Sequence, residues 1–261
     1  MKLENKVAVV AGGSRGIGRA ICLRLASEGA KVIVNYSDKA DQEEYAGSAE
    51  KVVDKIKAVG GEAIKYEADV ADKIKVNEMM DFIIKQYGQL DILVANAGIC
   101  PFEEFLKIEE ELLDRVIGVN LKGAFFCSQS AMDKMVELGI KGRIIFTSSV
   151  SAVFGGELQT HYCATKGAIN QLMKSIAIAG GKYGITSNAV LPGTVVTDIN
   201  RKQLLEGNTG LYEYFIKRTP LGRLATPEDI AGAVLFFASG DADCISGTAL
   251  TVDGGMSVNL Q

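Results

Sequence analysis

With 261 residues, of which 48% are hydrophobic and 23% charged, the chain has the composition of an ordinary globular protein. No apolar run reaches the ~18 residues of a membrane-spanning helix, and a net charge of −4 without a basic run argues against nucleic acid as the main ligand. The N-terminus leads into a predicted strand without a signal-peptide pattern, and the five cysteines form no CxxC pair. We therefore expect reduced thiols in a cytoplasmic protein, not a disulfide frame or a zinc site.

Short β-rich runs alternate with helical patterns along the chain. In chain order, the patterns predict strand 6–11, helix 17–27, strand 31–36, helix 41–59, strand 62–67, helix 73–87, strand 90–95, one bent or two separate helices within 109–138, strand 143–148, helix 161–183, strand 185–191, helix 227–238 and strand 248–252. Such alternation implies right-handed crossovers and a parallel sheet with helices on both faces. Because no Pro-, Ser- or charge-rich linker interrupts it, we expect residues 1–261 to form a single doubly wound α/β domain with seven parallel strands.

A glycine-rich turn, Gly12-Gly13-Ser14-Arg15-Gly16-Ile17-Gly18, joins the first strand to the first helix. Glycine lets the backbone turn sharply and approach a pyrophosphate, and the helix that follows offers free N–H groups and a positive dipole end. Tight strand–helix turns also use glycine for structure alone. The position of this turn favours a dinucleotide site that includes Gly12, Ser14, Arg15, Gly16, Ile17 and Gly18.

The end of the second strand contacts the adenosine ribose in dinucleotide-binding folds. Here the strand ends Asn35-Tyr36-Ser37, with no carboxylate before Asp38. A carboxylate at this place binds the 2′-hydroxyl of NAD and repels the 2′-phosphate of NADP, whereas Arg15 could reach that phosphate. We predict NADP as the preferred cofactor. NAD remains the alternative, in which Arg15 is solvated and Asp38 turns in.

Polar motifs also follow the third and fourth predicted strands, as Asp69-Val70 and Asn96-Ala97-Gly98. Ligands of a parallel sheet lie at the carboxyl ends of its strands. We expect Asp69 near the adenine amino group and the 96–98 motif on the adenosine side of the cleft. Turn formation alone would explain both motifs equally, because Asx residues and glycine end strands for local reasons.

Three residues near the fifth strand suggest a proton-transfer site. Tyr162 and Lys166 are four residues apart and therefore share one face of a helix. A lysine ammonium favours a neighbouring phenolate, and lowering a tyrosine pKa from about 10 to near neutrality needs roughly 3–4 kcal/mol. Ser149 precedes Tyr162 by thirteen residues, enough for a strand end and a loop to bring its hydroxyl to the same pocket. By itself, the YxxxK pattern also fits an ordinary amphipathic helix.

Together these motifs resemble the short-chain dehydrogenase/reductase family. GGSRGIG, the DV pair, ANAG, VNLKGAFF, the serine thirteen residues before YxxxK, LPGTVVT and VDGG occur in the family's order over nearly the whole chain. The resemblance implies a Rossmann-like fold, a nicotinamide cofactor, a homotetramer and a catalytic tetrad of Asn120, Ser149, Tyr162 and Lys166. The chain has Ala95 where the family usually has the first Asn of NNAG.

The resemblance also implies roles beyond the tetrad's central tyrosine. Asn120 would hold a water that links Lys166 to solvent as a proton path, and Lys166 would bind the nicotinamide ribose. Together with Tyr162 and Lys166, the segment after the sixth strand would contact the nicotinamide end of the cofactor, through Pro192, Gly193, Thr194, Val195 and Thr197.

Other segments resemble sugar 1-dehydrogenases of this family, with L-rhamnose as the favoured substrate: ICPFEEFL, GGELQTHYCATKGA, TPLGRL and VDGGMSVNLQ. A sugar needs several hydrogen-bonding groups around it, whereas an acyl chain would need an apolar groove. The expected substrate contacts are Ser149, Ser151, Gln159, Tyr162, Thr194 and Asn200. Glu157 and Gln159 would also fit an exposed loop, and we expect His161 to be a helix N-terminal residue, not a base.

Residues 200–218 are polar, rich in aromatics and placed after the nicotinamide segment. We predict a mobile substrate lid around residues 197–218; the alternative is a surface helix pair that serves only packing. We also expect residues 109–138 and 161–183 to form subunit interfaces, and Asn259-Leu260-Gln261 to reach a neighbouring subunit.

The sequence therefore predicts an NADP-preferring enzyme that oxidises the C1 hydroxyl of an aldose to a lactone. One alternative is an NADPH-dependent reductase of 3-oxoacyl thioesters carried on acyl carrier protein, against which the polar GGELQTH stretch argues. Another is a nucleotide-sensing protein without catalysis, against which the complete tetrad argues.

Overall fold

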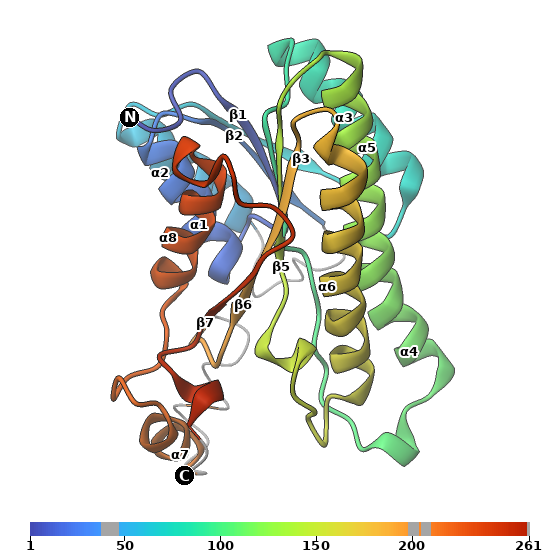
Figure 1. The fold of residues 1–261 in the computed structure, drawn as a ribbon, viewed down its shortest axis with the longest axis vertical. Coiled ribbons are helices and arrows are strands. Elements are labelled where there is room, and N and C mark those ends of the chain that lie inside the picture. Colours follow the sequence, from blue (N-terminus) through green and yellow to red (C-terminus); the bar gives the residue numbers. More distant parts are fainter. Residues whose placement is uncertain (38–46, 198–203, 205–209, 260–261) are drawn as a thin grey trace.

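The computed structural model describes residues 1–37, 47–197, 204 and 210–259 (Figure 1). Within this part of the chain, seven parallel strands form one sheet in the order β3-β2-β1-β4-β5-β6-β7. The strands are β1 (Val7–Ala11), β2 (Lys31–Tyr36), β3 (Ala63–Glu67), β4 (Ile92–Ala95), β5 (Arg143–Thr147), β6 (Thr186–Pro192) and β7 (Ala249–Val252). The predicted doubly wound seven-stranded parallel sheet is confirmed.

The central strands are apolar because both faces of the sheet are covered. All five residues of β1 are buried, and Val10 lies opposite Val34 of β2 on one side and Val94 of β4 on the other. A strand that is buried on both faces shows a continuous apolar run and no alternation. The strand order changes direction between β1 and β4, and ligands bind at such a point, beyond the carboxyl ends of the strands.

Helices cover the two faces as separate layers (Figure 1). One layer contains α1 (Gly16–Ser27), α2 (Ser48–Ala58) and α8 (Pro227–Ala238), and the other contains α3 (Lys73–Tyr87), α5 (Gly123–Glu137) and α6 (Thr160–Gly181). Each layer has its own apolar core, the first including Ile21 and Val234 and the second Met80 and Met173.

The stretch 109–138 forms two helices joined without a break. α4 (Glu110–Val116) continues into a π-helical turn at Ile117–Lys122 and then into α5. Such wide turns inside helices are frequent at functional sites. Asn120 lies in this turn and is fully buried.

Two predicted segments differ from the structure or extend beyond it. The helix predicted over residues 41–59 is described from Ser48, where α2 begins, and residues 38–46 lie outside the described part of the chain. Of the predicted lid, the structure describes Leu204 and α7 (Leu211–Arg218), while residues 198–203 and 205–209 lie outside it. Leu260 and Gln261 also lie outside.

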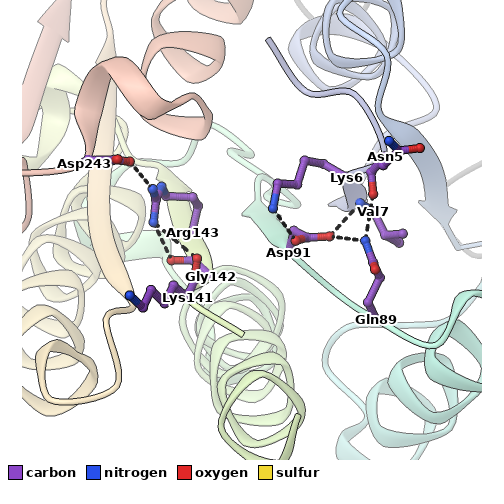
Figure 2. Close-up of polar contacts among 9 residues, drawn as sticks. All are labelled: Asn5, Lys6, Val7, Gln89, Asp91, Lys141, Gly142, Arg143 and Asp243. Atoms are coloured by element: carbon purple, nitrogen blue, oxygen red, sulfur yellow. Dashed lines mark hydrogen bonds and ion pairs between the residues drawn. The ribbon is translucent and has the colours of Figure 1, made fainter. Parts of the chain in front are cut away.

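Hydrogen bonds and ion pairs connect the amino ends of the central strands (Figure 2). These ends lie opposite the carboxyl ends, where parallel sheets bind ligands. Asp91 precedes β4 and is only 6% exposed. Its Oδ2 accepts hydrogen bonds from the Val7 backbone N–H (2.9 Å) and from Gln89 Nε2 (2.8 Å), and its Oδ1 accepts one from Lys6 Nζ (2.9 Å). The start of β1 is thereby fixed to the start of β4.

Arg143, the first residue of β5, makes a second polar cluster at this edge (Figure 2). Its guanidinium donates to the carbonyls of Lys141 and Gly142 at 3.3 Å each and pairs with Asp243. The strand starts are therefore fixed by protein contacts, and the opposite edge is left for a ligand.

Within the described ranges, no helix combines the length and apolar character needed to cross a membrane. The same residues include no group of three or more His, Cys, Asp or Glu side chains arranged to hold a metal ion. The five cysteines are all free thiols.

Candidate active site

A cavity of about 1360 Å³ lies at the carboxyl ends of the strands. Its wall includes every residue that the sequence predicted to contact a cofactor, from the glycine turn after β1 to Thr197 after β6. Segments far apart in sequence meet here because the carboxyl ends of parallel strands share one edge of the sheet.

The glycine turn between β1 and α1 has a shape that side chains would fill. Gly12 and Gly16 have φ angles of +68° and +52°, which L-residues other than glycine rarely adopt. A Cβ on Gly12 would lie 2.9 Å from Ala97 Cα, and one on Gly18 would overlap the Gly12 carbonyl oxygen and lie 2.7 Å from Asn96 Nδ2. Glycine therefore lets the turn pack closely against itself and against the segment after β4, and it places the start of α1 on the cavity wall. The N–H groups and positive dipole at this helix start fit the pyrophosphate of a dinucleotide.

Two predicted cofactor residues, Asn35 and Asn96, use their side chains to hold this turn in place. Asn35 Oδ1 accepts from the Gly12 N–H (3.2 Å), and its Nδ2 donates to the Ala68 carbonyl (3.0 Å). Asn96 Nδ2 donates to the carbonyls of Ala11 (3.2 Å) and Gly12 (3.1 Å). Both residues line the cavity, yet the amide contacts are to backbone, so they shape the turn more than they offer groups to a ligand.

Asp69 forms a local turn, which is the alternative to ligand binding that its position after a strand also allowed. Its Oδ1 accepts from the Ala71 N–H at 3.0 Å, which forms an Asx turn after β3. Asp69 and Val70 nonetheless lie on the cavity wall, together with Ala97 and Gly98 after β4.

Ser149, Tyr162 and Lys166 meet on the cavity wall, brought together by the end of β5 and the first turns of α6. The Ser149 hydroxyl hydrogen-bonds the Tyr162 phenol and also accepts from the Ser151 N–H at 3.0 Å. Lys166 is 3% exposed, and its Nζ lies 5.4 Å from the centroid of the Tyr162 ring. Lys166 Nζ donates to the Thr147 carbonyl at 2.7 Å, which fixes the ammonium beside the ring.

The electrostatics of this group differ from the sequence expectation. Burial raises the pKa of the Tyr162 phenol, with a smaller contribution from the nearby Cys100 thiol, and the hydrogen bond from Ser149 only partly opposes this rise. Burial also lowers the pKa of Lys166 to about 8. Burial on this wall disfavours the charged forms of both residues and so opposes the expected effect; that Lys166 and hydrogen bonds make Tyr162 a base near neutrality stays a prediction.

Asn120 lies behind the cavity wall and not on it. Its Oδ1 accepts from the Ile99 N–H (2.8 Å), and its Nδ2 donates to the Ile99 carbonyl (2.9 Å) and to Thr165 Oγ1 (3.2 Å). A Cβ on Gly98 would lie 3.4 Å from Asn120 Oδ1 and 3.7 Å from Lys166 Nζ, so glycine leaves the space between them clear. The side chain holds Ile99 and Thr165, and the water expected on the proton path stays a prediction.

Of the predicted substrate contacts, Ser151, Gln159 and Thr194 line the cavity beside Ser149 and Tyr162, and so does Glu157. Asn200 lies outside the described residues. His161 is buried away from the cavity wall, and neither ring nitrogen has a hydrogen-bond partner among the described residues.

Sequence reasoning missed an apolar part of this wall. Phe102 and Leu158 line the cavity and are 49% and 43% exposed, and Cys100 lies beside them. Leu211 and Phe215 of α7 line it as well. Phe102 stands six residues after Asn96, so its place beyond a strand end was a signal that could have been used.

Comparison with known proteins agrees with this geometry. Residues 11–257 match a family model described as enoyl-(acyl carrier protein) reductase. The chain is 46% identical to L-rhamnose 1-dehydrogenase (NAD(P)(+)) of Sphingomonas sp. (strain SKA58), over 99% of both chains. It is 42% identical to L-rhamnose 1-dehydrogenase (NADP(+)) of Thermoplasma acidophilum, over 100% of both chains.

A solved structure has the same fold. A gluconate 5-dehydrogenase from Burkholderia cenocepacia J2315, in complex with NADP and tartrate, superposes with a TM-score of 0.89 at 32% identity, covering 98% of this chain and 97% of the other. The chain belongs to the short-chain dehydrogenase/reductase family of NAD(P)-dependent oxidoreductases that act on CH–OH groups.

Proposed function

We propose that this protein oxidises the C1 hydroxyl of an aldose, with L-rhamnose favoured, to the lactone, and that NADP is the preferred acceptor. The observation that carries the proposal is the grouping of Ser149, Tyr162 and Lys166 in a cavity whose adjoining wall holds Ser151, Gln159 and Thr194. Relatives at 46% and 42% identity over their full length are named L-rhamnose 1-dehydrogenases.

The chain's own residues bind the sugar and move one proton. The Ser149 hydroxyl holds the oxygen on C1, and Tyr162 as phenolate takes its proton. Lys166, fixed by the Thr147 carbonyl, stabilises the phenolate and passes the proton toward solvent past Asn120. When bound, the oxidised nicotinamide supplies the hydride acceptor and a nearby positive charge. The glycine turn would hold the cofactor's pyrophosphate and residues 192–197 its nicotinamide end.

NADP preference is proposed because Arg15 lies on the same cavity wall as Tyr36 and Ser37, at the end of β2. A guanidinium there matches a 2′-phosphate in charge and geometry. Asp38, the residue on which the NAD alternative depends, lies outside the described residues.

A 6-deoxy sugar fits the mixed character of the wall. L-Rhamnose has hydroxyls for Ser151, Gln159 and Thr194 and a single methyl group, for which Phe102 and Leu158 offer apolar surface. L-Mannose is the same sugar with a hydroxyl added to that methyl. We expect kcat/KM for L-rhamnose to exceed that for L-mannose by about 10- to 100-fold, because burying the hydroxyl against apolar side chains costs free energy.

The wider setting is also part of the proposal. Residues 197–218 would close over the substrate, with Leu211 and Phe215 of α7 on the cavity wall. A homotetramer in the cytoplasm, acting in carbohydrate metabolism, is supported by apolar side chains left exposed on α5 (Phe125, 44%) and α6 (Ile178, 84%) and by the free cysteines.

Reduction of 3-oxoacyl thioesters is the second candidate. The exposed apolar side chains of Phe102 and Leu158 and the description of the matched family model favour it. The polar side chains around Tyr162 favour a sugar instead.

A substrate panel with both cofactors tests the proposal. Purified protein is assayed for reduction of NADP and NAD with L-rhamnose, L-mannose and other aldoses, and for oxidation of NADPH with an acetoacetyl thioester. Turnover with aldoses that is faster with NADP supports the proposal. Turnover with the thioester and none with any aldose would replace it with the second candidate.

A further inference from the structure

The side chains of Cys100 and Gln159 contact each other on the cavity wall. Gln159 Nε2 donates a hydrogen bond to Cys100 Sγ at 3.2 Å. A second bond, from the Glu103 N–H to the Leu158 carbonyl at 3.0 Å, joins the same two segments. The loop after β4 and the residues before α6 are therefore held together at two points, beside the residues proposed to bind substrate.

Hydrogen bonds fix the backbone of Gln159, so only the orientation of its side-chain amide can change. Its N–H donates to the Gly156 carbonyl at 3.0 Å, and its carbonyl accepts from the Cys163 N–H at 2.7 Å, at the start of α6. A Cβ on Gly156 would lie 2.8 Å from Gln159 Oε1, so glycine makes room for the amide oxygen. The hydrogen bond to Cys100 then determines that the amide nitrogen, and not the oxygen, faces the sulfur.

Cys100 is itself held from the protein interior. The preceding residue, Ile99, is fixed through both its N–H and its carbonyl by the buried side chain of Asn120. Burial raises the pKa of the Cys100 thiol to about 11, so the sulfur is uncharged at neutral pH and accepts a hydrogen bond from the Gln159 amide as a neutral thiol.

We propose that Cys100 is a positioning residue, whose neutral thiol orients the Gln159 amide so that its second N–H and its oxygen meet sugar hydroxyls. The inference rests on the proposed sugar oxidation and adds a residue that determines how the substrate is bound. It makes Cys100 the link through which the buried Asn120 sets the geometry of the substrate wall.

The first test is Cys100→Ala, with Cys244→Ser as the matched control because Cys244 is an exposed thiol outside the cavity wall. We expect Cys100→Ala to raise KM for L-rhamnose about three- to tenfold, the range of one lost hydrogen bond, with kcat within about twofold and KM for NADP unchanged. Cys244→Ser should leave all three constants unchanged.

Rescue and coupling separate positioning from general damage. Cys100→Ser keeps an acceptor and should restore KM to within about twofold of the original value. Gly156→Ala should raise KM by displacing the Gln159 amide. In a double-mutant cycle, Cys100→Ala should add no further increase to that caused by Gln159→Ala, because the thiol acts through the amide.

Binding without turnover provides an independent measurement. In a Tyr162→Phe background with NADP present, calorimetry should show that Cys100→Ala weakens L-rhamnose binding by the same factor as the rise in KM. An unchanged KM in Cys100→Ala, or an equal increase in the presence and absence of Gln159, would overturn the positioning role. If the unaltered enzyme oxidises no aldose, the proposed function fails instead.

Discussion

At the scale of single residues, burial and charge oppose each other around Tyr162. Removing the phenol and the Lys166 ammonium from water disfavours the ionised form of each, and the Ser149 hydrogen bond offsets only part of this for the phenol. We expect the positive charge of a bound oxidised nicotinamide to favour the phenolate as well. Ionisation of Tyr162 should therefore be coupled to cofactor binding.

This coupling predicts a pH dependence. Because burial raises the pKa of Tyr162, the phenolate needed for oxidation becomes more populated as the pH rises, so kcat/KM for sugar oxidation should increase from pH 6 to above pH 8. The reverse reaction needs the phenol and should slow over the same range. Initial rates in both directions across this range measure the effect, and an oxidation rate that falls with rising pH would contradict it.

Tyr162→Phe isolates the proton transfer. The substitution removes the phenolic oxygen and leaves the ring beside Lys166, so we expect turnover to fall by at least about a thousandfold, since no base remains within reach. NADPH binding should persist and can be followed by cofactor fluorescence. Near-normal turnover in this variant would disprove the assignment of Tyr162.

At the scale of an element, α8 illustrates how a local signal fixes a helix start. The Thr226 hydroxyl accepts from the Asp229 N–H (3.3 Å), and Asp229 Oδ2 accepts from the Thr226 N–H (2.8 Å), which forms a capping box. Arg223 pairs with the same carboxylate through both of its terminal nitrogens (2.6 and 3.1 Å). The sequence TPED therefore predicts a helix start, because its threonine and aspartate form the capping box.

The cap predicts a stability difference that depends on pH. The hydrogen bond and charge of Arg223 lower the pKa of Asp229 to about 2, below its unfolded value of about 3.9. The carboxylate's contribution is therefore fully present above pH 4 and is lost as the pH falls toward 2. Asp229→Asn should reduce the free energy of unfolding by about 1 kcal/mol at pH 7.

Thermal denaturation of Asp229→Asn at fixed protein concentration measures this difference, with Glu228→Gln as control. Glu228 is exposed in the same first turn and makes no part of the capping box. If both variants lose the same stability, the negative charge near the helix start accounts for the effect and the capping-box hydrogen bonds do not.

The same scale includes the π-helical turn between α4 and α5. It places Asn120 where its amide can hold Ile99, and Ile99 in turn places Cys100 against Gln159. A regular helix would rotate the residues after the turn by one position and break this sequence of contacts. The irregular turn thus connects a helix in one layer with the substrate wall.

At the scale of the whole molecule, the amino ends and the carboxyl ends of the strands have different functions. Protein contacts fix the amino ends of the central strands (Figure 2), and the carboxyl ends carry the cavity. Asp91 is central at the amino ends because it accepts from the start of β1 and precedes the start of β4.

Asp91→Ala should lower the free energy of unfolding by about 2–3 kcal/mol, because the buried Val7 N–H and the Gln89 amide each lose an acceptor. Urea denaturation at fixed protein concentration measures the change, with Asp54→Ala on the exposed side of α2 as control. An effect no larger than that of the control would mean that water replaces the carboxylate.

Much of the fold and of the tetrad could be predicted from the sequence. The predicted strand 31–36 and helix 73–87 agree with β2 and α3 to the residue, because apolar periodicity and glycine breaks are local properties. The YxxxK spacing and the serine before it likewise place Ser149, Tyr162 and Lys166 on one cavity wall.

Tertiary structure alone decided how those side chains are used. Asn35, Asn96 and Asn120 carry the polar groups that a ligand would need, yet their amides bond to backbone across the turn, the sheet and the π-helical segment. The meeting of Cys100 with Gln159 likewise depends on loops that only the folded sheet brings together. Local spacing determined which chemistry the chain carries. Partners and burial depend on long-range packing, which is why the raised pKa of Tyr162 could not be predicted from the sequence.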